Sequence, residues 1–226
     1  MRVGVLFSGG KDSTYACCRA MEAEEVVCLI TVTSNNPDSY MFHTPNIHLT
    51  GLQAEAIGLP LVSVASQGVK EEELADLRRA ILQAVEKYGV EGIVSGAILS
   101  VYQATRIQRL CLVLGLWCFN PLWHTNQEEY LSNLLAGGFE IIITGVFAAP
   151  LDERWLGRTM DKATLVSLRS IVQSHGITLT GEGGEYETFV SDAPFFRKRI
   201  EILQAHTTYR AHHGRYLIER ARLVPK

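Results

Sequence analysis

The residues best suited to chemistry lie near the N-terminus, in the stretch 8–13, which reads Ser-Gly-Gly-Lys-Asp-Ser. An apolar run at 3–7 predicts a buried strand before it, and 14–22 predicts a helix after it. Adjacent glycines let successive N–H groups point into one concavity, and a helix N-terminus attracts anions. The Ser8 and Ser13 hydroxyls add further donors and Lys11 adds positive charge, so the stretch predicts a polyphosphate site.

A second group of chemically capable residues lies near the C-terminus, where three glycines alternate with carboxylates. Clustered carboxylates can hold Mg²⁺, bind a cationic substrate or ammonium, or act as a general base. The alternative is a solvated acidic turn. Nearby aromatic rings could attract a quaternary ammonium through cation–π interactions, or could simply pack in the core. The carboxylates are Glu182, Glu185 and Glu187, and the aromatic residues are Trp155 and Tyr186.

Alternating strands and helices must position the first group. Short apolar runs predict strands at 26–32, 61–65, 90–94 and 116–119, and helical periodicity predicts helices at 49–57, 70–88 and 100–115. With the first strand, this order predicts an α/β fold with a doubly wound, parallel five-stranded sheet. Ligands of such sheets bind beyond the carboxyl ends of the strands. We therefore expect the site in the loops that begin near Ser8, Thr33, Ser66, Ser95 and Asn120.

The pattern changes after residue 120. We expect a helix at 126–135, a strand at 139–146, a helix at 161–175 and two antiparallel strands at 199–203 and 216–224. The sequence thus predicts two domains: a phosphate-binding domain over 1–121, and a smaller α+β domain over 122–226 that carries the substrate.

Composition narrows the class of protein. The chain has 226 residues, a net charge of −3 and a pI near 6.2, which argues against a broad basic surface for nucleic acid. Its five cysteines include no C-x-x-C pair, so neither a disulfide scaffold nor a standard zinc site is indicated. No apolar stretch has the length of a signal or membrane segment. We expect a soluble, cytoplasmic protein with no membrane partner.

The stretch 8–13 departs from the Walker A pattern, because its glycines are adjacent and Asp12 follows Lys11. It resembles instead the PP-loop of the N-type ATP pyrophosphatases, S-G-G-x-D-S, at every fixed position. That resemblance implies an adenine nucleotide alpha-hydrolase-like fold and a domain that binds ATP over 1–121. It also implies reaction at the α-phosphorus, with pyrophosphate as the leaving group.

Three further stretches, 39–44, 151–158 and 182–189, make the resemblance more specific. Together with the loop they resemble the diphthine–ammonia ligase family over almost the whole chain. The resemblance implies a ligase that joins ammonium to the carboxylate of diphthine, a modified histidine on elongation factor 2. ATP is then cleaved to AMP and pyrophosphate. The chain lacks the extra C-terminal domains of some eukaryotic members, which predicts a minimal, archaeal form.

The resemblance also implies roles for individual residues. Asp12 is expected to orient the loop or to hold Mg²⁺, and free ammonium is the expected nitrogen source. A homodimer is considered. The catalytic residues are then Lys11, Asp12, Glu185 and Glu187. ATP is bound by Ser8, Gly9, Gly10, Lys11, Asp12, Ser13, Thr31, Thr33 and Gly96. The substrate is bound by His43, Arg106, Trp155, Glu182, Glu185, Tyr186 and Glu187.

Two rival functions stay open at this point. A tRNA-modifying adenylase with a PP-loop needs reactive or cluster-binding cysteines and a basic RNA surface, and the sequence gives neither signal. A non-catalytic ATP-binding or sensor protein has no use for the C-terminal carboxylates, which weighs against it. Formation of AMP separates an enzyme from a sensor.

Overall fold

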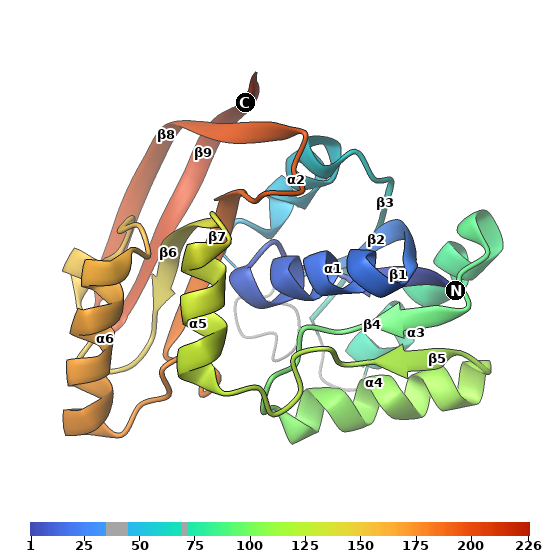
Figure 1. Cartoon of the computed structure of the whole chain (residues 1–226), viewed down its shortest axis with the longest axis horizontal. Helices are drawn as coiled ribbons and strands as arrows, with labels where there is room; N and C mark the ends of the chain where they lie inside the picture. The colour runs from blue at the N-terminus through green and yellow to red at the C-terminus, as the bar shows by residue number, and fades with distance from the viewer. Residues whose placement is uncertain (35–44, 69–71) are drawn as a thin grey trace. The chain divides into compact units, whose positions relative to one another are not determined.

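The chain divides into two compact units, Met1–His124 and Thr125–Lys226. The structure is a computed structural model and describes residues 1–34, 45–68 and 72–226 (Figure 1). Across these ranges, no helix has both the length and the hydropathy needed to cross a bilayer.

The first unit is built on a parallel sheet of five strands in the order β3-β2-β1-β4-β5. This confirms the predicted doubly wound α/β fold. The central strand β1 pairs in parallel with β2 on one side and with β4 on the other, and β5 forms one edge. The strands are β1 (Arg2–Leu6), β2 (Glu25–Ser34), β3 (Leu61–Ser66), β4 (Gly92–Val94) and β5 (Trp117–Phe119).

Helices flank this sheet. The helices α3 and α4 share one apolar core with it, in which Leu77, Ile81 and Ile107 pack with buried strand residues such as Val32 and Ile93. Helix α1 also buries one face, which is formed mainly by small side chains. The helices are α1 (Lys11–Ala23), α2 (Thr50–Ile57), α3 (Glu72–Tyr88) and α4 (Val101–Leu114), with a short 3-10 turn η1 (Ile47–Leu49) before α2.

The second unit contains a four-stranded antiparallel sheet in the order β7-β6-β9-β8. Two helices lie side by side in this unit (Figure 1), and an ion pair of 2.6 Å between Arg169 and Glu128 links them. The strands are β6 (Glu140–Val146), β7 (Tyr186–Asp192), β8 (Lys198–Arg210) and β9 (His213–Pro225); the helices are α5 (Gln127–Ala136) and α6 (Lys162–His175), and η2 (Glu153–Trp155) is a 3-10 turn.

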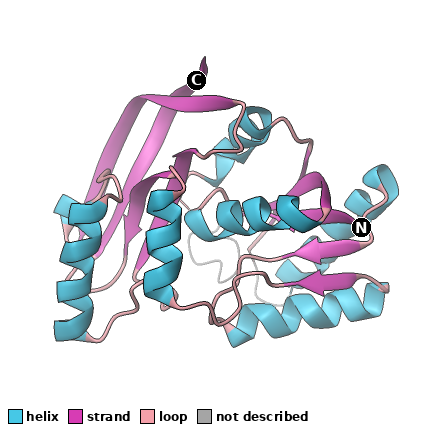
Figure 2. Ribbon diagram, viewed as in Figure 1, coloured by secondary structure: helices cyan, strands magenta, loops and turns pink. Residues whose placement is uncertain are grey.

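Two elements of the second unit differ from the sequence prediction. The two short terminal strands are in fact a long hairpin of 13 residues per strand (Figure 2), closed by Ala211 and His212 with φ of 49° and 67°. Two successive positive φ angles are typical of the tight turns that match the twist of a hairpin. The other difference is β7, a strand that the sequence patterns do not predict. Glu187 therefore lies on a strand and not in a flexible turn.

Candidate functional site

The predicted phosphate loop lies between the end of β1 and the first turn of α1. Gly9 has φ of +79°, a left-handed conformation that favours glycine. Gly10 is the N-cap of α1 and supplies no side-chain cap. The first turn of a helix presents backbone N–H groups without intrahelical acceptors, together with the positive end of the helix dipole. The local fold thus builds an anion site from backbone.

The two serines hold the loop in shape. Ser13 Oγ accepts a hydrogen bond from the Ser8 backbone N–H at 3.2 Å and lies 3.2 Å from Ser8 Oγ. It also donates to the carbonyl of Gly10 at 3.2 Å. One hydroxyl therefore joins the beginning, the middle and the end of the loop.

Lys11 is buried at the start of α1, with only 3% of its surface exposed. Its Nζ donates to the Asp12 carboxylate at 2.9 Å. A buried ammonium is costly unless it is paired, and here its neighbour in sequence supplies a paired charge. The pair places one cation and one anion at the helix N-terminus.

Three residues outside the loop lie against it or against Phe7, the residue that precedes it. Gln53 of α2 donates from Nε2 to the carbonyl of Gly9 at 2.9 Å, and a Cβ on Gly9 would lie 2.0 Å from Gln53 Oε1. Thr31 donates from Oγ1 to the carbonyl of Phe7 at 2.6 Å. A Cβ on Gly96 would lie 2.8 Å from the backbone of Asp12 and Ser13, so glycine lets the segment after β4 approach α1.

These contacts refine the sequence assignments. Of the residues assigned to ATP, Gly96 lies against the loop and Thr31 bonds to Phe7 just before it. Thr33 is half-buried near the carboxyl end of β2. Sequence reasoning missed Gln53 altogether. No local pattern marks it, because its contact spans 44 positions of sequence.

On α4, the guanidinium of Arg106 lies 3.4 Å from the centre of the Tyr102 ring. The two residues are one turn apart, as their spacing predicts. The stacking holds Arg106 over its own helix in a half-buried position.

In the second unit, Glu185 organises the loop that precedes β7. Its carboxylate accepts hydrogen bonds from the backbone N–H of Thr178 at 2.6 Å and from Thr178 Oγ1 at 2.9 Å. Only 7% of its surface is exposed. A Cβ on Gly183 would lie 2.6 Å from Glu185 Oε1, so the loop wraps closely around this carboxylate. The observed contacts are those of an internal brace.

The predicted aromatic residues are largely enclosed. Tyr186 is buried and donates from its hydroxyl to the carbonyl of Leu179 at 2.8 Å. Trp155 is also buried, and the guanidinium of Arg158 lies 5.1 Å from its ring centre. Glu182 is half-buried in the same loop as Glu185. His43, with the whole stretch 39–44, lies outside the described residues.

Glu187 belongs to a group that sequence reasoning did not assemble. The strand order places Gly145 of β6 between Glu187 on β7 and Arg215 on β9. The Phe147 ring lies close by, and His213 is 6.1 Å from it between ring centres. No periodicity could reveal this group, because it depends on which strands become neighbours.

The buried thiols of α1 and β2 show no sign of nucleophilic activation. Burial raises the pKa of the Cys28 thiol to about 12 and raises that of Cys17 well above its ordinary value. A hydrogen bond between Cys111 and Cys118 raises the pKa of the former and lowers that of the latter. In the described residues, no group of three or more histidine, cysteine or carboxylate side chains could hold a metal ion.

Both units match family models of known proteins. Residues 1–118 match the family model of the diphthamide synthase N-terminal domain, and residues 126–224 match that of the diphthamide synthase C-terminal domain. A diphthine–ammonia ligase of Rattus norvegicus is 37% identical over 222 residues, which cover 89% of this chain and 83% of the rat protein. The Homo sapiens protein of the same name shows the same identity and coverage.

A fungal relative is longer. The diphthine–ammonia ligase of Schizosaccharomyces pombe is 33% identical over 221 residues, which cover 89% of this chain but 36% of the yeast protein. These relatives are animal and fungal, so they do not support the archaeal origin expected from the sequence. Since the two family models together span nearly all of the chain, it belongs to the diphthamide synthase family.

Proposed function

We propose that the protein is an ATP-dependent diphthine–ammonia ligase. In this reaction the carboxylate of diphthine on elongation factor 2 attacks the α-phosphorus of ATP. Pyrophosphate leaves, and ammonia then displaces AMP from the acyl adenylate to give the amide of diphthamide. The observation that carries the proposal is the braced loop 8–13 at the start of α1, in a chain that matches this family over both units.

The loop supports the first step by charge neutralisation. Negative charge builds on the pyrophosphate as it leaves, and fixed donors aimed at that charge stabilise the transition state. The backbone of Gly9 and Gly10, the first turn of α1 and the ammonium of Lys11 are such donors. The contacts from Gln53 and Ser13 fix the loop in advance, so little reorganisation is needed when ATP binds.

Magnesium is part of the proposal. Mg²⁺ in nucleotide sites takes its ligands from phosphate oxygens, water and one or two carboxylates. Asp12 is the carboxylate of the loop, beside Lys11, and it could supply this one protein ligand. The described residues contain no group of three or more potential metal ligands, which agrees with a site that depends mainly on phosphate oxygens and water. Bound Mg²⁺ would add positive charge at the phosphates.

We assign the first unit to ATP and the second to the diphthine side chain, with free ammonium as the nitrogen donor and the cytoplasm as the location.

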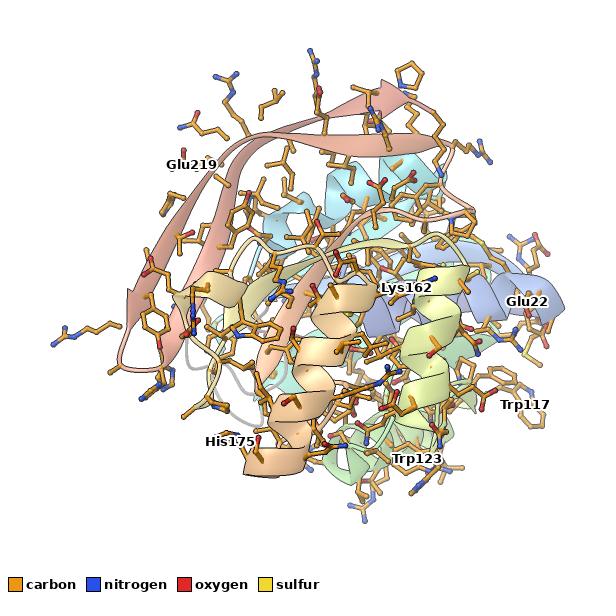
Figure 3. All side chains as sticks on the ribbon, turned by 60° about the vertical axis from the view of Figure 1, so that its left-hand side comes forward. Glu22, Trp117, Trp123, Lys162, His175 and Glu219 are labelled. Atoms are coloured by element: carbon orange, nitrogen blue, oxygen red, sulfur yellow. The ribbon has the colours of Figure 1, made fainter. Side chains whose placement is uncertain are left out.

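A homodimer completes the proposal, supported by an apolar surface on the first unit. Leu112 and Val113 of α4 are 79% and 77% exposed, and Trp117 on the edge strand β5 is 65% exposed. Figure 3 shows the Trp117 side chain projecting outward.

Formation of AMP tests the proposal against its rivals. Purified protein with ATP, Mg²⁺ and ammonium should form AMP when diphthine-bearing elongation factor 2 is added, and not when tRNA is added. AMP that appears only with tRNA would establish the tRNA-modifying adenylase instead. A protein that binds ATP but never forms AMP would be a sensor. The buried, high-pKa thiols of Cys17 and Cys28 do not supply the reactive cysteines that the tRNA route needs.

A further inference from the structure

The pairing around Gly145 brings two oppositely charged residues together within the second unit. Gly145 pairs with Glu187 on one side and with Arg215 on the other. Side chains of directly paired residues stand on the same face of a sheet, so Glu187 and Arg215 flank Gly145 on one face. Adjacent strands are about 4.8 Å apart, which puts the two backbone positions roughly 10 Å from each other. Both side chains are long and half-buried.

An aromatic ring covers the gap that the glycine leaves. A Cβ on Gly145 would lie 2.6 Å and 2.8 Å from two carbons of the Phe147 ring and 3.1 Å from Glu187 Cβ. The Arg215 guanidinium lies 5.8 Å from the centre of the same ring. A negative side chain, an aromatic face and a positive side chain thus occur in that order across three strands.

Arg215 has an unsatisfied donor here. Its Nε has no solvent access and no hydrogen-bond partner among the residues that the structure describes. A buried donor of a charged group is costly to leave unpaired, so such a group marks a position where an acceptor is expected. The planar guanidinium matches a carboxylate in particular, because it can donate two parallel hydrogen bonds to it.

We propose that Glu187, Phe147 and Arg215 form a zwitterion site for a side chain that carries both a quaternary ammonium and a carboxylate. Arg215 receives the carboxylate, and Phe147 with Glu187 receives the ammonium by cation–π and charge attraction. This inference rests on the proposed function, whose substrate carries both groups. It names the residues that would distinguish the trimethylated side chain from its unmethylated precursor.

The contacts that the site offers should favour a trimethylated ammonium over a primary one. A quaternary ammonium has no N–H to donate, and it is attracted to an aromatic face and a diffuse negative charge. A primary ammonium requires several hydrogen-bond acceptors to replace its water, and of the three side chains only the Glu187 carboxylate offers any. The site should therefore prefer the trimethylated form.

Binding of a free betaine tests the site without catalysis. The probe is histidine trimethylated at its α-nitrogen, with unmethylated histidine as the matched probe, titrated into the full chain and followed by NMR. We expect saturable binding of the trimethylated probe to the wild type. Arg215→Gln and Phe147→Leu should each weaken it by about tenfold or more, while Arg215→Lys should retain part of it. Arg222→Gln is the control, because Arg222 is an exposed arginine of the same strand that pairs with Glu201 at 2.6 Å.

Kinetics separate this inference from the proposed function. If the wild type amidates the factor, Arg215→Gln should raise KM for the factor and leave KM for ATP unchanged. A wild type that binds the probe but does not amidate would overturn the ligase assignment and leave the site standing. The site itself is overturned if the wild type ignores the trimethylated probe, if it binds unmethylated histidine equally well, or if Arg222→Gln loses as much affinity as Arg215→Gln.

Discussion

Lys11 is the residue on which the chemistry of the first unit depends most. Its buried ammonium should offset charge on the leaving pyrophosphate, so Lys11→Ala should slow turnover by about 2–4 kcal/mol of barrier, typical of losing one such donor. Pyrophosphate release from the factor-dependent reaction is the measurement, and Lys87→Ala on α3 is the control because Lys87 lies over the Tyr88 ring, outside the loop. A folded Lys11→Ala protein that releases pyrophosphate at the wild-type rate would remove Lys11 from the mechanism.

Glu185 is a single residue whose contacts indicate a role in stability. The sequence predicts a catalytic role for it, and in the structure its carboxylate accepts two hydrogen bonds from Thr178 within a buried loop. Glu185→Gln keeps one acceptor oxygen and loses the charge, so we expect the free energy of unfolding to fall by about 1–3 kcal/mol. Urea denaturation measures this.

The control for that measurement is Glu153→Gln, at an exposed carboxylate of η2. It should leave the denaturation midpoint where it is. A Glu185→Gln protein that keeps the wild-type midpoint and yet forms no amide would contradict the bracing role and support the predicted catalytic one.

Site residues whose arrangement depends on their sequence neighbours could be predicted. Site residues that are brought together from distant segments could not. The loop 8–13 is visible because its shape depends on adjacent glycines and on the next helix. Gln53 and Arg215 gave no signal, since one contacts the loop from α2 and the other reaches Gly145 only through the order of the strands. His43 and its stretch lie outside the described residues.

The elements of the first unit follow from hydrophobic periodicity and from helix caps. Long apolar runs such as β2 were visible because a central parallel strand is buried on both faces. By contrast, β7 was missed because its glycine-rich approach and its alternating polar residues resemble a turn. The terminal hairpin was underestimated, since its exposed residues break the period-2 pattern.

The N-cap of α6 gives a test at the scale of an element. Asp161 accepts a hydrogen bond from the Thr164 backbone N–H at 2.7 Å, and that bond lowers the pKa of its carboxyl. Because the folded pKa lies below the unfolded value of about 3.9, the stabilisation is fully present above that value. It is lost as the pH falls through the folded pKa.

The pH dependence can be measured with two Ala variants. The difference in Tm between wild type and Asp161→Ala should stay constant from pH 7 to 5 and shrink as the pH falls below about 4. Asn126→Ala is the control, since the neutral Asn126 side chain caps α5 through the N–H groups of Glu128 and Glu129. Its difference in Tm should not depend on pH in the same way. Parallel behaviour of the two variants would contradict the assignment of the lowered pKa to this cap.

At the scale of the whole molecule, the exposed apolar surface of α4 and β5 is suited to a second copy of the chain. Closed pairs of identical subunits use one self-complementary surface, and an apolar edge strand is otherwise an aggregation hazard. A Leu112→Ser, Trp117→Ser double variant should sediment as a monomer where the wild type sediments as a dimer. Val166→Ser is the control, at a valine that is 61% exposed on α6. A monomeric wild type would end the dimer proposal.

The broad architecture of each unit could be predicted because two kinds of pattern occur in separate parts of the chain. Alternating strands and helices define the doubly wound sheet of the first unit, and a change of pattern after residue 120 precedes the antiparallel sheet of the second. The structure adds the pairing of β6 with both β7 and β9, and that pairing creates the candidate zwitterion site.

The central claim is that this chain forms an amide on a protein-bound diphthine. Its most direct test is the mass of diphthine-bearing elongation factor 2 after incubation with the protein, ATP, Mg²⁺ and nitrogen-15 ammonium. Replacing a hydroxyl by a labelled amino group leaves the factor's mass nearly unchanged, whereas unlabelled ammonium lowers it by about one unit, with one AMP per site from the adenylate route. Incorporation of the label at the diphthine residue is the predicted result. A factor that never takes up nitrogen, while the same protein consumes ATP, would contradict the account.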